Sequence, residues 1–280
     1  MTLRGQRIHV GWRGLLGIAA LGLLVPTMSQ GSHLGNEPSA IHGPLARGED
    51  RGATVSSNWS GYVATGTTFT DVVASWTAPA VTCTGQAQYS SYWIGIDGYL
   101  PGDKKNVEQV GTDSDCTKTT GGKKHQHLGG PVYYAWWDMY PARTAEFSTG
   151  SCPVSPGDAM TAQVSSAVVT DSSGNTSTQY TLMLSDATQG WQCSSPPETS
   201  AAPATSAEWV VEAPFKVANK QILPLANFGS VGFSGAQANA TPISGFTNDV
   251  IIMREGSTVE ALPSPIGSDG ASFTVTWEHQ

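Results

Sequence analysis

Residues 207–212 read Ala-Glu-Trp-Val-Val-Glu. In an extended strand side chains alternate between two faces, so Trp209 and Val211 share an apolar face while Glu208 and Glu212 lie on the other. The two carboxylates are ~13 Å apart along the strand, from four residues at ~3.3 Å each, which is too far for a directly paired acid dyad. The stretch predicts a strand with one face in a hydrophobic core and two separate carboxylates on the opposite face.

The same texture continues outward from this strand through most of the chain. Short runs rich in Val, Ile, Thr, Trp and Tyr are broken by Gly, Pro, Asn and Ser, a pattern typical of antiparallel sheets. Helical periodicity is absent beyond the N-terminal apolar stretch, so we expect very little helix. Residues 194–206, with three prolines, predict a surface loop. The other predicted strands are Ser57–Val63, Asp71–Thr77, Gln88–Ile96, Asn106–Thr112, Val132–Tyr140, Ala159–Val169, Thr178–Ser185, Ala226–Phe233, Asp249–Arg254 and Ser272–Glu278.

So many strands exceed what one flat sheet holds, and we expect an all-β sandwich of two large antiparallel sheets. Residues 54–280 are enough for a single domain of this kind, since such domains commonly run to ~200–250 residues. Residues 1–30 predict a signal peptide, because three arginines precede an apolar stretch, Leu15 to Val25, that is too short to span a membrane. Residues 31–53 are polar and lack periodicity, which favours a pro-segment or a disordered leader.

Charge and cysteine content narrow the class of protein. After Ala53 the chain has nine Lys and Arg against nineteen Asp and Glu, a net charge of 9 − 19 = −10, which makes nucleic acid an improbable partner and suits an acidic environment. Four widely spaced cysteines predict two disulfides in a secreted, extracellular protein. Three pairings are open, and locality weakly favours Cys83 with Cys116 and Cys152 with Cys193.

Common hydrolase motifs are missing from the sequence. There is no Gly-x-Ser-x-Gly, no His-Glu-x-x-His and no Asp-Thr-Gly or Asp-Ser-Gly, which disfavours a serine hydrolase, a zinc peptidase and a pepsin-like enzyme. His125 and His127 lie in a Gly- and Lys-rich stretch without a third metal ligand, so we expect no metal and no cofactor.

A second strand offers a polar side chain without charge. In residues 106–111, Asn-Val-Glu-Gln-Val-Gly, alternation places Gln109 with Val107 on one face and Glu108 on the other. Glu108 therefore points away from any site that Gln109 lines.

An ordered series of strings resembles the glutamic peptidases, or eqolisins, over nearly the whole of residues 54–280. The strings are Ser57-Asn58-Trp59-Ser60-Gly61-Tyr62, Trp93-Ile94-Gly95-Ile96-Asp97-Gly98, Val107-Glu108-Gln109-Val110-Gly111-Thr112-Asp113, Ala135-Trp136-Trp137-Asp138-Met139-Tyr140-Pro141, the strand 207–212, and Phe228-Gly229-Ser230-Val231. The resemblance departs at the stretch 118–130, which is longer than the family pattern, and at Met139, where an aromatic residue is common.

The resemblance implies a concanavalin-like sandwich with a concave substrate groove and a secreted, acid-acting endopeptidase made as a zymogen. Gln109 and Glu212 take the catalytic positions, with Glu208 in support. The groove residues implied are Trp93, Asp97, Asp113, Trp136 and Asp138. We expect protein or peptide substrates, no nucleic acid, no membrane association after signal removal, and a monomer. The alternative is a secreted carbohydrate-binding sandwich, because exposed aromatic residues on a sheet also stack on sugar rings.

Overall fold

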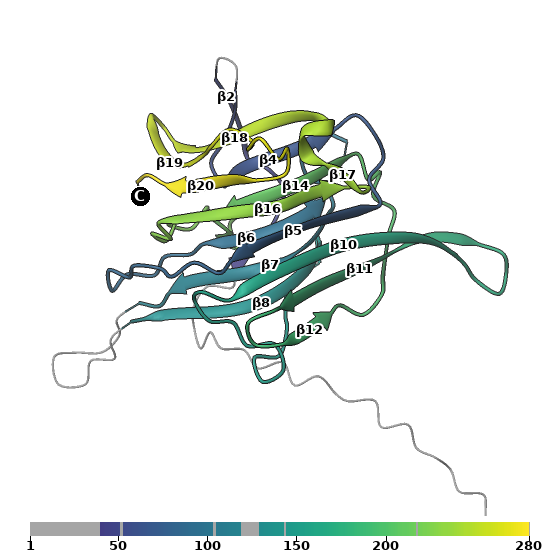
Figure 1. Ribbon diagram of the computed structural model, residues 1–280, viewed down its shortest axis with the longest axis horizontal. Coiled ribbons are helices and arrows are strands. Elements are labelled where there is room, and N and C mark those ends of the chain that lie inside the picture. The colour runs from purple at the N-terminus through teal and green to yellow at the C-terminus, as the bar shows by residue number, and fades with distance from the viewer. Residues whose placement is uncertain are drawn as a thin grey trace, which may run out of the picture.

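The computed structural model describes residues 40–50, 53–102, 105–118, 129–142, 144–216 and 218–279. In these ranges the protein is all β apart from one 3-10 turn, η1 (Ile243–Gly245), which confirms the predicted fold class. The strands form two stacked layers that Figure 1 views face on, so that strands of one layer cross in front of the other.

The first layer, called sheet A below, contains β14 (Ser206–Glu212), the strand predicted from residues 207–212. Its neighbours are β6 (Ser91–Ile96) and β4 (Trp59–Thr65). The remaining strands continue outward on either side, with β7, β8 and β9 beyond β6 and with β18, β3 and β2 beyond β4: β7 (Val107–Cys116), β8 (Pro131–Tyr140), β9 (Ala145–Glu146), β18 (Thr247–Glu255), β3 (Ala53–Ser56) and β2 (Arg47–Asp50).

The second layer, called sheet B below, is built around the long hairpin of β10 (Ala159–Thr170) and β11 (Thr176–Asp186). Next to β10 lie β5 (Asp71–Thr77) and then β16 (Ser230–Ala238). The strands that complete this layer are β12 (Trp191–Ser194), β13 (Glu198–Ser200), β17 (Thr241–Pro242) and β20 (Phe273–Trp277). β19 (Thr258–Pro263) pairs with both β18 and β20 and thereby joins the two layers along one edge.

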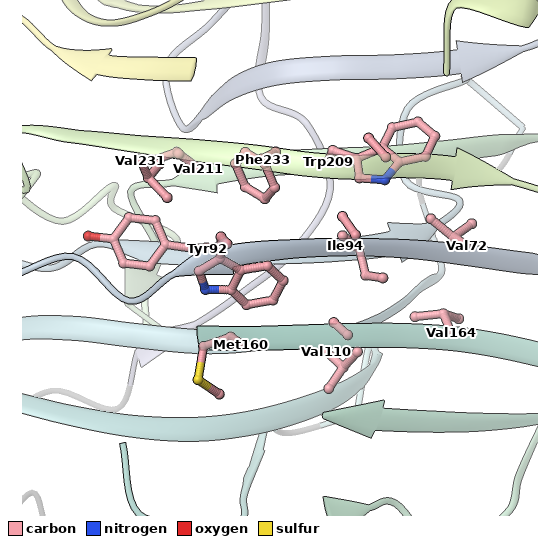
Figure 2. Packing of buried hydrophobic residues seen from close by; sticks show 14 of the residues in the cluster. Val72, Tyr92, Ile94, Val110, Met160, Val164, Trp209, Val211, Val231 and Phe233 are labelled. Carbon is pink, nitrogen blue, oxygen red and sulfur yellow. The ribbon is translucent and has the colours of Figure 1, made fainter. Parts of the chain in front are cut away.

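Apolar side chains from both layers fill the space between the sheets. Figure 2 shows Ile94, Val110 and Trp209 of sheet A against Val164 and Phe233 of sheet B. All five are buried, and Trp209 is fully enclosed. This core fixes which face of each strand of sheet A points outward, because a slip of one residue would move every core side chain to the opposite face.

The opposite, outer face of sheet A carries a second apolar cluster that includes Trp59, Trp93 and Trp136. Gly111 lies in register with Trp93 on one neighbouring strand and with Trp136 on the other. A Cβ at Gly111 would come within 2.5 Å of the Trp93 Cβ, so only glycine lets the Trp93 side chain take this place.

Part of the stretch before Thr54 also lies on this outer face. Residues 40–46 are called the leader segment below. Its first strand, β1 (Ala40–Ile41), pairs with β15 (Phe215–Lys216), and Leu45 belongs to the outer apolar cluster. Within the predicted pro-segment or disordered leader, residues 31–53, the structure thus describes β1 and β2. The signal-peptide prediction lies outside the described residues.

Most predicted strands are confirmed, and two expectations are corrected. Asp71–Thr77 is reproduced as predicted, whereas Ala226–Phe233 is displaced to Ser230–Ala238. The predicted loop 194–206 includes the short strand Glu198–Ser200, which forms because β11 offers it a free edge. Thr258–Pro263 was not predicted, because its glutamate and proline are uncommon in strands. The strand forms through pairing with β18 and β20.

Two disulfides join Cys83 with Cys116 and Cys152 with Cys193, as the local pairing predicted. In the part of the chain that the structure describes, no helix has the length and apolar character needed to cross a bilayer.

A pair of valines on β10 tests the two-layer core. Val164 is fully buried between the sheets, whereas Val168, four residues along the same strand, is 72% exposed. We expect Val164→Ala to lower the free energy of unfolding by about 2 kcal/mol, from two buried methyl groups and the cavity they leave. Val168→Ala, with the same change in strand propensity, should cost under about 0.5 kcal/mol. Denaturant unfolding of the full chain measures both, and equal losses would contradict this core.

Candidate active site

Glu212, the last residue of β14, is fully buried and accepts several hydrogen bonds. Its Oε2 accepts from Trp93 Nε1 at 2.9 Å. Its Oε1 accepts from the backbone N–H of Gly43 at 3.2 Å and from Asn58 Nδ2 at 3.4 Å. Burial raises the pKa of the Glu212 carboxyl, and the contacts from His42, Gly43 and Trp93 oppose that rise. The group is thus a buried carboxyl that can exchange a proton above the usual range for glutamate.

Ser91 on β6 lies between the two acidic residues: it is in register with Asp113 on β7 and with Glu212 on β14. Trp136 Nε1 donates to Asp113 Oδ1 at 2.6 Å, and the Tyr134 hydroxyl donates to Asp113 Oδ2 at 2.7 Å. The two donors come from β8, so the β7–β8 pairing fixes the orientation of this carboxylate.

His42 of the leader segment lies between these two carboxylates. Its Nδ1 is 3.5 Å from Glu212 Oε2 and its Nε2 is 3.5 Å from Asp113 Oδ2. The imidazole stacks on Trp136 with ring centroids 3.8 Å apart and an angle of 13° between the planes. Only 1% of His42 is exposed.

Gln109 is on the same face of β7 as Asp113, as alternation predicted, and it is fully buried. Its amide nitrogen and oxygen have no hydrogen-bond partner within the described ranges. Gly95 stands opposite it on β6, where a Cβ would come within 2.9 Å of the Trp93 ring and 3.3 Å of the Gln109 Cβ. A buried amide of this kind holds two donors and an acceptor ready for a ligand.

The register separates Gln109 from Glu212 along the strands. Gln109 shares its row with Gly95 and Glu208, whereas Glu212 lies four residues further along β14. In a flat sheet the Cα atoms of Gln109 and Glu212 would be ~16 Å apart, from two strand spacings and four residues. Curvature of the sheet has to shorten this distance between the Cα atoms, and the two side chains together with a bound ligand have to bridge what remains.

Asp138 lies opposite Gln109 on β8 and belongs to the same face. Thr144 Oγ1 donates to its Oδ2 at 3.0 Å, while Oδ1 has no hydrogen-bond partner in the described part of the chain. Burial raises the pKa of Asp138 to about 7, with a further rise from the charge of Glu212.

Two of the predicted site residues have other surroundings. Asp97 accepts the backbone N–H groups of Ala204 and Thr205, both at 2.8 Å, so it anchors the chain that enters β14. Its part in lining a groove stays a prediction. Glu208 is buried on the same face as Glu212, in register with Gly95 and Val63.

Sequence reasoning missed four residues that contact the two central carboxylates or lie beside them. Asn58 was within a quoted string but received no role, and Asp115 could have been found because alternation puts it on the same face as Asp113. Tyr134 bridges Asp113 and Asp115, at 2.7 Å and 3.0 Å from one oxygen of each. His42 had no signal in sequence, because its position depends on how the leader segment crosses sheet A.

Comparisons with known proteins identify the family and the fold of this chain. Residues 57–275 match the Peptidase A4 family. Scytalidopepsin B of Scytalidium lignicola is 29% identical over 132 residues, covering 47% of this chain and 43% of that protein, so the chain matches less than half the length of this curated relative.

Among solved structures, scytalido-glutamic peptidase with a transition state analog inhibitor superposes with a TM-score of 0.62 at 20% identity, over 79% of this chain and 98% of that one. SCP-B, a member of the eqolisin family solved in a complex with a tripeptide Ala-Ile-His, gives 0.58 at 18% identity with the same coverage. These two likenesses show the β-sandwich fold. The family match over residues 57–275 shows that this chain belongs to the Peptidase A4 family, the eqolisins.

Proposed function

We propose that the protein is a secreted, acid-acting endopeptidase and that the outer face of sheet A is its substrate groove. The single observation that carries the proposal is the contact between Gly43 N–H and Glu212 Oε1. The chain's own peptide backbone is held there against a buried carboxyl with a raised pKa. A substrate peptide in the same place would present its amide nitrogen to that carboxyl.

In the proposed reaction Glu212 acts first as a general base. It takes a proton from a water molecule whose oxygen attacks the carbonyl carbon of the scissile bond. The amide N–H groups of Gln109 donate to the oxyanion of the tetrahedral intermediate. Glu212 then returns its proton to the amide nitrogen, the carbon–nitrogen bond breaks, and an amine and a carboxylic acid leave.

The other groove residues would hold the catalytic groups and the substrate. Trp93 donates to Glu212 and thereby orients its carboxylate. Asp113, held by Trp136 and Tyr134, and Asp138, next to Gln109, would receive polar groups of a bound peptide.

We also propose that the leader makes the full-length chain a zymogen. The leader segment covers Glu212, Trp59 and Asn58, whose side chains contact Gly43 or Pro44. The SCP-B structure contains a tripeptide Ala-Ile-His, and the leader has the same three residues in succession, Ala40-Ile41-His42. The signal peptide predicted at residues 1–30 and the two disulfides support secretion.

The two glutamates of β14 test the catalytic assignment. Glu212→Gln should abolish hydrolysis of a denatured protein at acidic pH, because a neutral amide cannot accept the proton of water. Glu208→Gln, a matched change on the same strand face, should retain more activity. Gln109→Ala should lose ~10²–10³ in turnover through the missing oxyanion donor.

Rates are compared with pepstatin and a metal chelator present, after a trace of wild-type protein has removed the leader from every variant. If Glu208→Gln were the more damaging change, Glu208 would be the base, and its shared row with Gln109 would explain why.

The zymogen proposal predicts where the chain is cut. β3 pairs with β18 within sheet A, whereas β1 and the leader segment lie on the surface of that sheet. We expect acid incubation to produce a new N terminus close to Ala53, at the connection between β2 and β3. Intact-mass spectrometry at successive times measures the cut, and a fully active protein that keeps its complete leader would refute the proposal.

An acidic working environment predicts a fold that is more stable in acid. Burial, and then the charge of Glu255, raises the pKa of Glu260 to about 7, and Asp138 is raised to about 7 as well. The folded state therefore holds these protons more tightly than the unfolded state does. The stabilisation from these protons is complete below pH ~4.3 and is lost as the pH rises through about 7.

We expect the thermal unfolding midpoint of the full-length Gln109→Ala protein, which should not process itself, to fall between pH 4.5 and pH 8. Glu260→Gln should reduce that fall, because a neutral amide has no proton to lose. Glu198→Gln, on the short strand β13, should leave the fall as it was. Scanning calorimetry at both values of pH makes the comparison, and an equal fall in all three proteins would contradict the assignment.

A further inference from the structure

His42 is a cation-forming side chain enclosed by acidic groups from three strands. Asp113 and Asp115 come from β7, Asp138 and Tyr134 from β8, and Glu212 from β14. Its two ring nitrogens are each 3.5 Å from a carboxylate oxygen, on Glu212 and on Asp113.

The pocket matches an imidazole in shape as well as in charge. Trp136 forms one wall, parallel to the ring at 3.8 Å, and donates its own N–H to Asp113. Trp136 thus holds one oxygen of Asp113, while the other oxygen, Oδ2, lies 3.5 Å from His42 Nε2. A flat cation stacked on an indole gains both dispersion and cation–π attraction. A lysine could meet the charge but not the stacking.

Backbone hydrogen bonds and the buried Leu45 side chain hold the rest of the leader segment. Gly43 O accepts from Trp59 Nε1 at 3.0 Å, and Pro44 O accepts from Asn58 Nδ2 at 3.3 Å. Ala46 N donates to Asn58 Oδ1 at 2.8 Å. The His42 side chain is the part of the segment that meets both buried carboxylates.

We propose that Asp113, Trp136 and Glu212 form a subsite for the side chain of a histidine, and that His42 is its ligand in the full-length chain. The proposal rests on the proposed function in so far as it treats this face as a peptide-binding site. It adds the class of ligand: peptides that carry an imidazole at this position. It also gives the leader a specific inhibitory residue, because His42 places its ring nitrogen beside the carboxylate that has to activate water.

The charges set the pH range in which the subsite binds most tightly. Burial alone would lower the pKa of His42, but Asp113, Glu212 and Asp138 outweigh it and raise the pKa to about 9. The contribution of the imidazolium to binding is thus complete below pH ~6.5 and is lost as the pH rises through about 9. On the acid side, protonation of Glu212 and Asp138 removes their attraction. Binding should therefore be strongest near neutral pH and weaken on acidification.

The first test measures the subsite without any activity. Full-length protein with the Gln109→Ala substitution and isotope-labelled histidines is titrated with pH and followed by NMR. The His42 signal is assigned by its loss in the His42→Gln variant. We expect the imidazole to titrate well above 6.5, and Asp113→Asn to lower that midpoint by roughly one unit or more. Asp171→Asn, in an exposed turn, should leave it unchanged. A midpoint near 6.5, or one that Asp113→Asn does not move, would overturn the proposal.

The second test uses the leader as a separate ligand. A blocked peptide with residues 40–45, Ala-Ile-His-Gly-Pro-Leu, is compared with the same peptide carrying Gln for His42. Against acid-processed protein at pH 6 the histidine peptide should inhibit at least about tenfold more strongly, because it supplies the partner of two buried carboxylates. The difference should shrink at pH 3. Equal inhibition by both peptides at pH 6 would refute the subsite.

Failure of the proposed function gives a different result. If the processed protein cleaves no substrate, peptide binding is followed by quenching of tryptophan fluorescence instead. A histidine preference would then support the subsite while the peptidase proposal fails. Peptidase activity with no histidine preference would support the function and overturn the subsite.

Discussion

Packing of Trp209 and Val211 between the two sheets forces Glu208, Val210 and Glu212 onto the outer face of β14. A strand has only two faces, and the apolar contacts across the sandwich decide which one turns inward. The same constraint acts on β7, where Val110 in the core leaves Gln109 and Asp113 outside. Hydrophobic packing on one side of sheet A therefore places the polar side chains on the other side.

Those polar groups are buried as well, which costs free energy unless each finds partners. Asp113 is satisfied by Trp136 and Tyr134, both on the neighbouring strand. Glu212 depends in part on the leader segment, through Gly43 and His42. Its other two contacts come from sheet A itself, through Trp93 and Asn58.

Strand alternation made much of the site predictable from the sequence. Gln109 and Glu212 lie on the outer face of sheet A, and Glu108 on the opposite face of β7, as the period of two required. Alternation did not predict that the Asp97 carboxylate accepts two backbone N–H groups from the approach to β14. Short strands such as Glu198–Ser200 were missed, since their pairing comes from a neighbouring edge and not from their own residues.

By itself the sequence determined the fold class, the two faces of residues 106–111 and 207–212, the disulfide count and the family, because these depend on local periodicity and on ordered strings of residues. Only the tertiary structure decided how the strands align in register, which puts Gln109 in the row of Glu208 and Glu212 in the row of Asp113. It also decided that His42 lies between Glu212 and Asp113. His42 and Glu212 are 170 positions apart, and such a contact follows from how separate strands pair and cross, which local side-chain patterns do not encode.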